Sequence, residues 1–388
     1  MVVNFEFLDE EPIENVITCM NFRIDKVVFF GYKDLIERKE KQTADFLRTV
    51  CKVETVVFHE VTKNSLQSAV DTIRKVVIHE KDKGNDVFFD VTGGDSLIPI
   101  AFGMLAKELE APMHIYDIPK EKLVEINLGK TPNISKVPVQ RKIPMTLELF
   151  IKMHGGAINM NLHKDIKGLD NPEFVDDVMK IYQVAAGNWS CWNTFTNFLR
   201  DRMRPSQGLE VTVNSRHIYN LLKSDVNSAL KGIDKLNDMI DALKETGALS
   251  NVERNSESYT IEYKNEEIME SLWEGGSVLE LYTCFMETKN SDECRVGVHL
   301  DWDGIIHTTP GIDVLNEIDV LSLSGNIATF ISCKSGRMSS SQSLHALYEL
   351  ETVVERFGGK YAKKVLVTAN PLDDVYMERA KEMGIEVR

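Results

Sequence analysis

The sequence lacks the usual marks of a membrane or secreted protein. No apolar run approaches the roughly 20 residues that span a bilayer, and the opening MVVNFEFLDEEP is acidic where a signal peptide would be basic. The six cysteines are scattered, without a C-x-x-C pair or a companion histidine spacing, so neither a disulfide framework nor a zinc site is indicated. We therefore expect a cytoplasmic protein with buried or unreactive thiols.

The sequence is also short of positive charge. Its formal net charge is -15, whereas broad affinity for duplex nucleic acid comes mainly from Lys and Arg that neutralise phosphates. A nucleic-acid substrate would therefore need local basic patches. The 43% hydrophobic and 27% charged residues are typical of a soluble globular protein, and 388 residues are enough for two or three domains.

Short apolar runs alternate with helix-like stretches over residues 1–118. The strand-like runs are VVNFEFL, KVVFFGY, ETVVFHEV, DVFFDVTGG and MHIYDI. Strands separated by amphipathic segments predict crossover units and a mainly parallel sheet with helices on both faces. The chain is thus expected to be α/β with a Rossmann-like N-terminal domain, and the proline-containing segment 119–144 is expected to be an edge strand or a connection.

The middle of the chain, residues 145–270, is mostly helical in pattern. A helix that ends at Gly247 is followed by a polar loop between strand-like pieces, which resembles a winged helix-turn-helix. Two interpretations stay open, DNA binding or a connector and dimerisation module. We favour the connector, because the candidate recognition helix is as acidic as it is basic.

The final stretch opens with a helix and continues with three strands, a helix, a strand and a terminal αβ pair. We therefore divide the chain into residues 1–144, 145–270 and 271–388. No internal repeat and no low-complexity segment is present.

A strand runs into the loop DVTGGDS and a helix follows at once. The unpaired N–H groups and partial positive charge of such a helix start can hold a phosphate or a ribose, and two glycines let a ligand approach the backbone. The G-x-G-x-x-G, G-x-x-x-x-G-K and G-x-S-x-G fingerprints are all missing. An ordinary tight turn is the alternative.

This loop resembles the second ligand motif of the CARF domain, the sensor of cyclic oligoadenylates in type III CRISPR immunity. The resemblance extends over most of residues 1–140, including FLDEEPIENV and FFGYKD. It implies a ligand bound across the two-fold axis of a homodimer. The ligand-binding residues it implies are Asp90, Thr92, Gly93, Gly94, Asp95 and Ser96, with Asp9, Glu10, Gly31 and Tyr32 as weaker candidates.

The C-terminal strands NEIDV and FISCKSG carry a second group of candidate functional residues. Alternate side chains on a strand share a face, so Glu317 should point with Asp319. Likewise, Ser332 should point with Lys334. Cutting a phosphodiester requires a divalent metal held by carboxylates and a nearby cation. Asp319 would supply a metal ligand and Lys334 the cation.

Together with Glu280 on the preceding helix, this layout resembles the PD-(D/E)xK nuclease fold, except that Ser332 stands where an acidic residue is usual. At 100° per residue, the next helix places Glu351 inside an apolar arc and Glu349 outside it. The arc consists of Leu344, Leu347, Leu350, Val353, Val354 and Phe357. Since an inward carboxylate is costly unless it is paired or bound to metal, we expect Glu351 to replace the lost acid, with Glu349 as second choice. A Glu351 that merely extends to water is the alternative.

The expected catalytic residues are Asp319, Lys334, Glu280, Glu351, Glu317 and Ser332, and the expected metal ligands are Asp319, Glu280 and Glu351. Asp301 and Asp303 are expected to be turn residues. The side chains of three histidines could assist the site, although a lone histidine is more often structural: His299, His307 and His345.

The two resemblances together imply a homodimeric effector. Cyclic tetra-adenylate would activate a Mg²⁺- or Mn²⁺-dependent endonuclease that cuts DNA, RNA or both in antiviral defence. One alternative is a ligand-controlled transcription regulator with a decayed nuclease domain, which Ser332 favours. Another is a small-molecule Rossmann enzyme, against which the missing phosphate-binding fingerprint counts.

Overall fold

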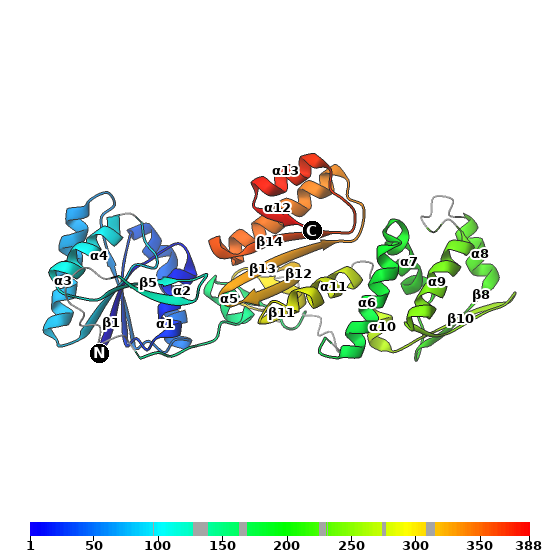
Figure 1. Ribbon diagram of the computed structural model, residues 1–388, viewed down its shortest axis with the longest axis horizontal. Helices are drawn as coiled ribbons and strands as arrows, with labels where there is room; N and C mark the ends of the chain where they lie inside the picture. Colours follow the sequence, from blue (N-terminus) through cyan, green and yellow to red (C-terminus); the bar gives the residue numbers. More distant parts are fainter. Residues whose placement is uncertain are drawn as a thin grey trace.

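The computed structural model describes residues 1–95, 97–126, 139–162, 169–224, 230, 232–273, 277–307 and 315–388. Its described strands form three sheets along the long axis of the molecule (Figure 1). The N-terminal sheet lies at one end, the small sheet of the middle region lies at the other, and the C-terminal sheet lies between them. Among the described residues, no helix is long and apolar enough to cross a membrane.

The N-terminal sheet has the strand order β3-β2-β1-β4-β5-β6. Its strands are β1 (Val2–Phe7), β2 (Lys26–Gly31), β3 (Thr55–Glu60), β4 (Asp86–Asp90), β5 (Met113–Asp117) and β6 (Lys122–Ile126). The neighbouring pairs from β3 to β5 are parallel, and β6 runs antiparallel to β5 at the edge. The parallel sheet and the edge strand in the proline-containing segment therefore match the expectation; residues 127–138 of that segment lie outside the described residues.

Helices pack against this sheet, so that every residue of β1 and β2 except the first is buried. They are the 3-10 helix η1 (Pro12–Asn15), α1 (Ile17–Asn21), α2 (Lys33–Thr49), α3 (Leu66–Asp82) and α4 (Leu97–Glu108). Fully buried aromatic side chains fill the centre of the domain, among them Phe5, Phe29, Phe30, Phe89 and Phe102.

The middle region combines helices with a three-stranded antiparallel sheet of order β8-β10-β9. Its elements are α6 (Pro172–Ala186), α7 (Trp189–Arg202), β8 (Glu210–Asn214), α8 (Ser215–Ser224), α9 (Ile233–Thr246), β9 (Leu249–Arg254), β10 (Ser258–Tyr263) and α10 (Glu266–Ser271). Gly247 ends α9 in the left-handed region, with φ of +85°, which a glycine adopts without strain. Two helices followed by a hairpin give the expected winged-helix arrangement.

The C-terminal sheet has the order β15-β14-β13-β12-β11-β7. Its elements are α11 (Ser277–Thr288), β11 (Glu293–Asp301), β12 (Leu315–Ser324), β13 (Ile327–Lys334), α12 (Ser340–Phe357), the 3-10 helix η2 (Gly359–Tyr361), β14 (Lys363–Thr368), α13 (Asp374–Glu382) and β15 (Ile385–Val387). The edge strand β7 (Ala157–Ile158) follows α5 (Leu147–Met153) and pairs with β11. The C-terminal sheet thus includes one strand from residues 145–270 in addition to the strands from residues 271–388. The boundaries expected after residues 144 and 270 stay predictions.

Two hydrophobic cores cover opposite faces of the C-terminal sheet. One core runs from the N-terminal sheet to the face that carries Phe330, where Leu347 of α12 packs. The other joins the middle region to the face that carries Ile331, where Leu281 of α11 packs. All six cysteines are free and all but Cys294 are buried, as expected. The C-terminal sheet is therefore in contact with both other parts of the chain.

Candidate functional site

Strands β12 and β13 bring Asp319 and Lys334 together. Lys334 ends β13, and its Nζ lies 3.8 Å from Oδ2 of Asp319. The side chain of Lys334 is 31% exposed and that of Asp319 is 19% exposed, so solvent reaches the pair. A carboxylate and an ammonium group in an open position can together hold a cation and a phosphate.

The surroundings of Asp319 explain the position of Ser332. Oδ2 of Asp319 accepts hydrogen bonds from the Ser332 hydroxyl at 3.1 Å and from the Cys333 backbone N–H at 2.5 Å. Lys334 approaches the same oxygen. The contacts found among the described residues all go to Oδ2, and none of them is to Oδ1. Ser332 therefore orients the Asp319 carboxylate instead of providing a second one.

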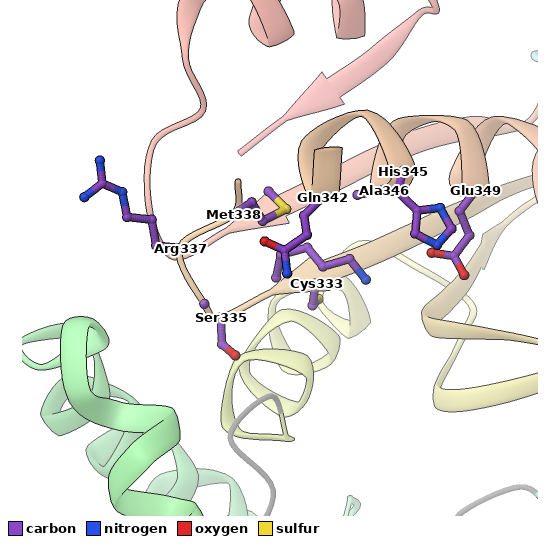
Figure 2. Close-up of a pocket in the computed structure, with 10 residues that line it drawn as sticks. Cys333, Ser335, Arg337, Met338, Gln342, His345, Ala346 and Glu349 are labelled. Atoms are coloured by element: carbon purple, nitrogen blue, oxygen red, sulfur yellow. The ribbon is translucent and has the colours of Figure 1, made fainter. Parts of the chain in front are cut away.

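A cavity of about 320 Å³ opens between the end of β13 and the N-terminal half of α12 (Figure 2). Lys334 lines it from the strand side, and Gln342, His345 and Glu349 line it from the helix. The three helix residues lie within roughly 60° of one another at 100° per residue, so one face of α12 presents them together. Arg337 also lines the cavity, but in Figure 2 its side chain points away from the helix.

The structure places Glu349, the second choice, at the cavity and Glu351 away from it, while their order as metal ligands stays a prediction. The Glu351 carboxylate lies 2.5 Å from Nζ of Lys364 on β14 and does not line the cavity, whereas Glu349 does. Glu351 can lie beside the buried face because Lys364 pairs with it, which the sequence of one helix does not reveal. The expected apolar arc is buried except for Leu344, which is exposed.

Glu317 does not share a face with Asp319. Ile318 packs into the core on the α12 side, but Val320 packs into the core on the α11 side, so the alternation along β12 is interrupted between them. Glu317 instead lies 3.9 Å from Nε2 of His299 on β11. The structure therefore does not bring Glu317 into the Asp319 site.

Glu280 lies on α11, which covers the opposite face of the sheet from α12. Burial raises the pKa of the Cys333 thiol, and the charges of Asp319 and Glu280 raise it further. Both carboxylates are thus close enough to act on one thiol, one of them from β12 and the other from α11. Within the described ranges, no group of three or more His, Cys, Asp or Glu side chains is placed to hold a metal ion.

Asp301 is a turn residue, as expected. Its Oδ1 accepts hydrogen bonds from the backbone N–H groups of Asp303, Gly304 and Ile305. Asp303 accepts a hydrogen bond from Ile305 in the same turn. These two carboxylates are therefore not part of the Asp319 site.

In the N-terminal domain, Asp90 points into the domain, and its expected contact with a ligand stays a prediction. Asp90 is 2% exposed, and its carboxylate accepts hydrogen bonds from the Thr18 and Thr92 hydroxyls, both at 2.5 Å. Burial acts to raise the pKa of Asp90, but the facing His114 and these donors hold it below its usual value. Asp90 thus fixes the base of the loop from inside the domain.

The Gly-Gly turn lies against Asp9. The Gly94 N–H donates to Oδ2 of Asp9 at 2.8 Å, and Gly94 has φ of +120°, in a region that favours glycine. The Thr92 hydroxyl, which donates to Asp90, also accepts the Tyr116 N–H at 2.8 Å. Asp9 and Thr92 therefore hold the loop in place.

Tyr32 and Asp95 are the expected ligand residues that reach the surface of the loop. The Tyr32 hydroxyl donates to the exposed Asp95 carboxylate, and burial together with this contact raises the pKa of Tyr32. Glu10 is exposed and pairs with Arg38. Gly31 is buried, and a Cβ there would lie 3.0 Å from Ile36. Ser96 lies outside the described residues.

Several contact residues have no signal in the sequence. Gln342, His345 and Glu349 are spaced i, i+3 and i+7 on one face of α12. The sequence does not reveal that this face is the one that lines the cavity. Glu11 and Glu14 in EEPIEN contact the turn after α12, far away in the chain. No periodicity could have predicted such a pairing.

Comparison with known proteins agrees with this geometry. Residues 271–388 match the family model described as Card1-like, endonuclease domain. No curated protein matches the sequence. Among solved structures, protein VC1899 from Vibrio cholerae is 18% identical, with a TM-score of 0.70, and the match covers 100% of this chain and 93% of that one.

Can2 from Sulfobacillus thermosulfidooxidans, solved in complex with cyclic tetra-adenylate, is 12% identical with a TM-score of 0.65, again over 100% of this chain and 93% of that chain. At these identities the likeness shows the fold. The expected architecture, a Rossmann-like N-terminal domain, a winged-helix-like region and an α/β C-terminal domain that matches the endonuclease model, is thereby confirmed.

Proposed function

We propose that this chain, with its Card1-like endonuclease domain behind a CARF-type domain, is a metal-dependent endonuclease activated by a cyclic oligoadenylate in type III CRISPR defence. It would cut DNA, single-stranded RNA or both. The observation that carries the proposal is the Asp319–Lys334 pair, in which the contacts of the carboxylate go to one oxygen, beside an ammonium group.

We propose a divalent ion with few protein ligands, which is compatible with the lack of a three-ligand group among the described residues. Mg²⁺ commonly takes one or two carboxylates, and waters and substrate phosphate complete its shell. Oδ1 of Asp319 would be the first ligand, and the further carboxylates that we propose are Glu349 from α12, which lines the cavity with Lys334, and Glu280 from α11. Glu351 is left out because Lys364 holds it. A bound ion would polarise the phosphate and make a water more acidic.

The remaining chemistry belongs to side chains around the cavity. Lys334 would stabilise the negative charge that develops on the phosphate oxygens. Gln342 and His345 offer hydrogen-bonding groups from the opposite wall. An open cavity of about 320 Å³ is suited to one phosphate and its flanking sugars.

The ligand loop supports a cyclic oligoadenylate as activator. The Can2 structure contains cyclic tetra-adenylate, and this chain shares its fold. The turn at Gly93 and Gly94 leads into α4, where the helix start favours phosphate. Tyr32 offers an aromatic face, and Lys63 lies 5.0 Å from the centre of its ring, so a cation is available next to that face.

A homodimer would complete the ligand site. Ile100 and Met104 of α4 are 50% and 51% exposed, and a Cβ at Gly103 would meet no atom within 4 Å. An apolar helix face directly after the ligand loop suits a two-fold contact, because a two-fold symmetric ligand fits an isologous interface.

Incubation of the full chain with Mn²⁺ or Mg²⁺ and plasmid or single-stranded RNA, with and without cyclic tetra-adenylate, tests this function. We expect cleavage only when both metal and ligand are present. The Asp319→Ala and Lys334→Ala variants should each lose about 100-fold or more of the rate. Cleavage that ignores the ligand would remove the sensor role, and full activity in either variant would remove this catalytic site.

A second candidate is a ligand-controlled transcription regulator whose nuclease has decayed. The winged-helix-like region and the lack of a three-ligand metal group among the described residues favour it. Ligand-dependent binding of duplex DNA in the presence of a chelator, with no cleavage after metal is restored, would select this candidate.

A further inference from the structure

The loop that precedes α1 and the turn that follows α12 are bonded to each other. The Lys360 N–H donates to Oε2 of Glu11 at 2.7 Å, and the Tyr361 hydroxyl donates to Oε1 of Glu14 at 2.6 Å. Nζ of Lys360 lies 2.5 Å from the same Glu14 oxygen. Both glutamates are buried, whereas the Lys360 side chain is 56% exposed.

Glu14 also touches the ligand loop directly. A Cβ at Gly93 would lie 3.0 Å from Cβ of Asp9 and 3.1 Å from Oε2 of Glu14. Gly94 is hydrogen-bonded to Asp9 at 2.8 Å. Even an added methyl group at Gly93 would crowd the Glu14 carboxylate, so a movement of the Gly-Gly turn toward Glu14 should displace it.

On the other side, Glu11 packs against the turn after α12. Gly359 has φ of +64°, and a Cβ there would collide with the Glu11 carboxylate. Nε2 of His154 lies 3.5 Å from Oε1 of Glu11. The Arg356 guanidinium, in the last turn of α12, donates to the carbonyl oxygens of His154 and Gly155. The C-terminal end of α12 is thus fixed to the same small group.

Helix α12 reaches from this group to the nuclease cavity. It is one continuous helix, with Arg356 at one end and Gln342, His345 and Glu349 facing the cavity in its other half. Arg356 and His345 are roughly 16 Å apart along its axis at 1.5 Å per residue. Because its inner face is packed into the shared core, the helix should move as a unit.

We propose that Glu11 and Glu14 are positioning residues, which pass the state of the Gly93–Gly94 loop to the C-terminal turn of α12 and so set where Glu349 lies in the cavity. The inference rests on the proposed function, since it assigns the route by which a bound cyclic oligoadenylate controls the nuclease site. The physical element is a rigid helix whose two ends contact the two sites.

Tyr361→Phe tests the route with the least disturbance, because it removes only the hydroxyl that donates to Glu14. Tyr348→Phe is the matched control: its hydroxyl lies on the exposed side of α12 and accepts a hydrogen bond from Arg379 at 3.0 Å. We expect Tyr361→Phe to reduce the stimulation of cleavage by cyclic tetra-adenylate about 5-fold or more. Its cleavage without ligand should stay at the wild-type value, and its thermal midpoint should fall by only a few °C, because a single hydrogen bond is lost.

Hydrogen exchange gives a readout that does not require cleavage and that can be compared between the wild-type protein and both variants. Cyclic tetra-adenylate should change the protection of residues 356–362, and Tyr361→Phe should reduce this change while Tyr348→Phe should not. Ligand that binds by calorimetry without altering these residues would overturn the inference and leave the proposed function intact. Ligand that does not bind at all would overturn both.

Discussion

At the residue scale, the site depends on how the two oxygens of Asp319 are used. Oδ2 is held by the Ser332 hydroxyl, the Cys333 N–H and the approach of Lys334. This directs the carboxylate, and we propose that Oδ1 meets a cation. An acidic side chain at position 332 would place a second negative charge beside Oδ2, so serine is compatible with a site that takes its further carboxylate from elsewhere.

Ser332→Ala should lower the rate of metal-dependent cleavage without abolishing it. Loss of one hydrogen bond to a charged carboxylate costs about 1.5 kcal/mol or more, which corresponds to roughly 10-fold in rate if the bond is needed in the transition state. Single-turnover cleavage at saturating metal measures the effect, with the surface variant Ser250→Ala as control. A loss as large as that of Asp319→Ala would mean that Ser332 itself reacts or binds the metal.

Glu6 makes the stability of the N-terminal domain depend on pH. Burial and the nearby Asp90 charge raise the pKa of Glu6 well above its usual value, although Asn4 donates a hydrogen bond to it. A group whose folded-state pKa is raised keeps its proton longer in the folded state, so the free energy of unfolding falls as pH rises above about 4.5.

Glu6→Gln should remove this pH-dependent decrease in the free energy of unfolding, because the amide carries no charge and still offers an oxygen that accepts a hydrogen bond from Asn4. Urea denaturation at pH 5 and pH 8 should show a smaller decrease in the free energy of unfolding for the variant than for the wild type. Glu14, whose pKa burial also raises, is present in both proteins and cancels in the comparison. Equal decreases would mean that Glu6 is not the group responsible.

At the scale of elements, helix α12 separates two carboxylates that are two positions apart. Glu349 faces the cavity with Lys334, and Glu351 pairs with Lys364 at 2.5 Å. Glu349→Gln should therefore reduce cleavage about 100-fold or more if its carboxylate binds the metal or the water. Glu351→Gln should keep most activity and lose about 1 kcal/mol of stability, because a half-buried ion pair is broken. Cleavage assays and urea denaturation of both variants test this, and the reverse result would restore Glu351 as the metal ligand.

The same helix shows what could be predicted from the sequence. The apolar arc of α12 and the strand that ends in Lys334 follow from periodicity, since backbone geometry dictates them. The role of Glu351 does not follow, because it depends on Lys364 of β14. Asp90 is a similar case: Thr18 and His114, from other elements, turn it inward. Side chains at the ends of strands and on partly buried helix faces take their direction from partners that are distant in the chain.

At the scale of the whole molecule, the C-terminal sheet is the part that packs against both the N-terminal domain and the middle region. One face shares a core with the N-terminal domain and the other shares a core with the middle region. A movement of the N-terminal domain must therefore be accommodated in the packing beside α12, because packed cores deform little. The connector interpretation of the middle region agrees with this arrangement, since its core supports the α11 face.

Assembly of two chains is the last requirement of this scheme. Ile100→Glu should convert a dimer to a monomer, because it places a charge in the centre of the exposed apolar face of α4. Ile78→Glu on α3 is the matched control, since Ile78 is also exposed but lies away from the ligand loop. Sedimentation equilibrium measures the state of association, and calorimetry should show that the affinity of Ile100→Glu for cyclic tetra-adenylate falls at least about 10-fold, because each monomer keeps only half of the contacts. A variant that stays dimeric and binds normally would place the two-fold contact on another surface.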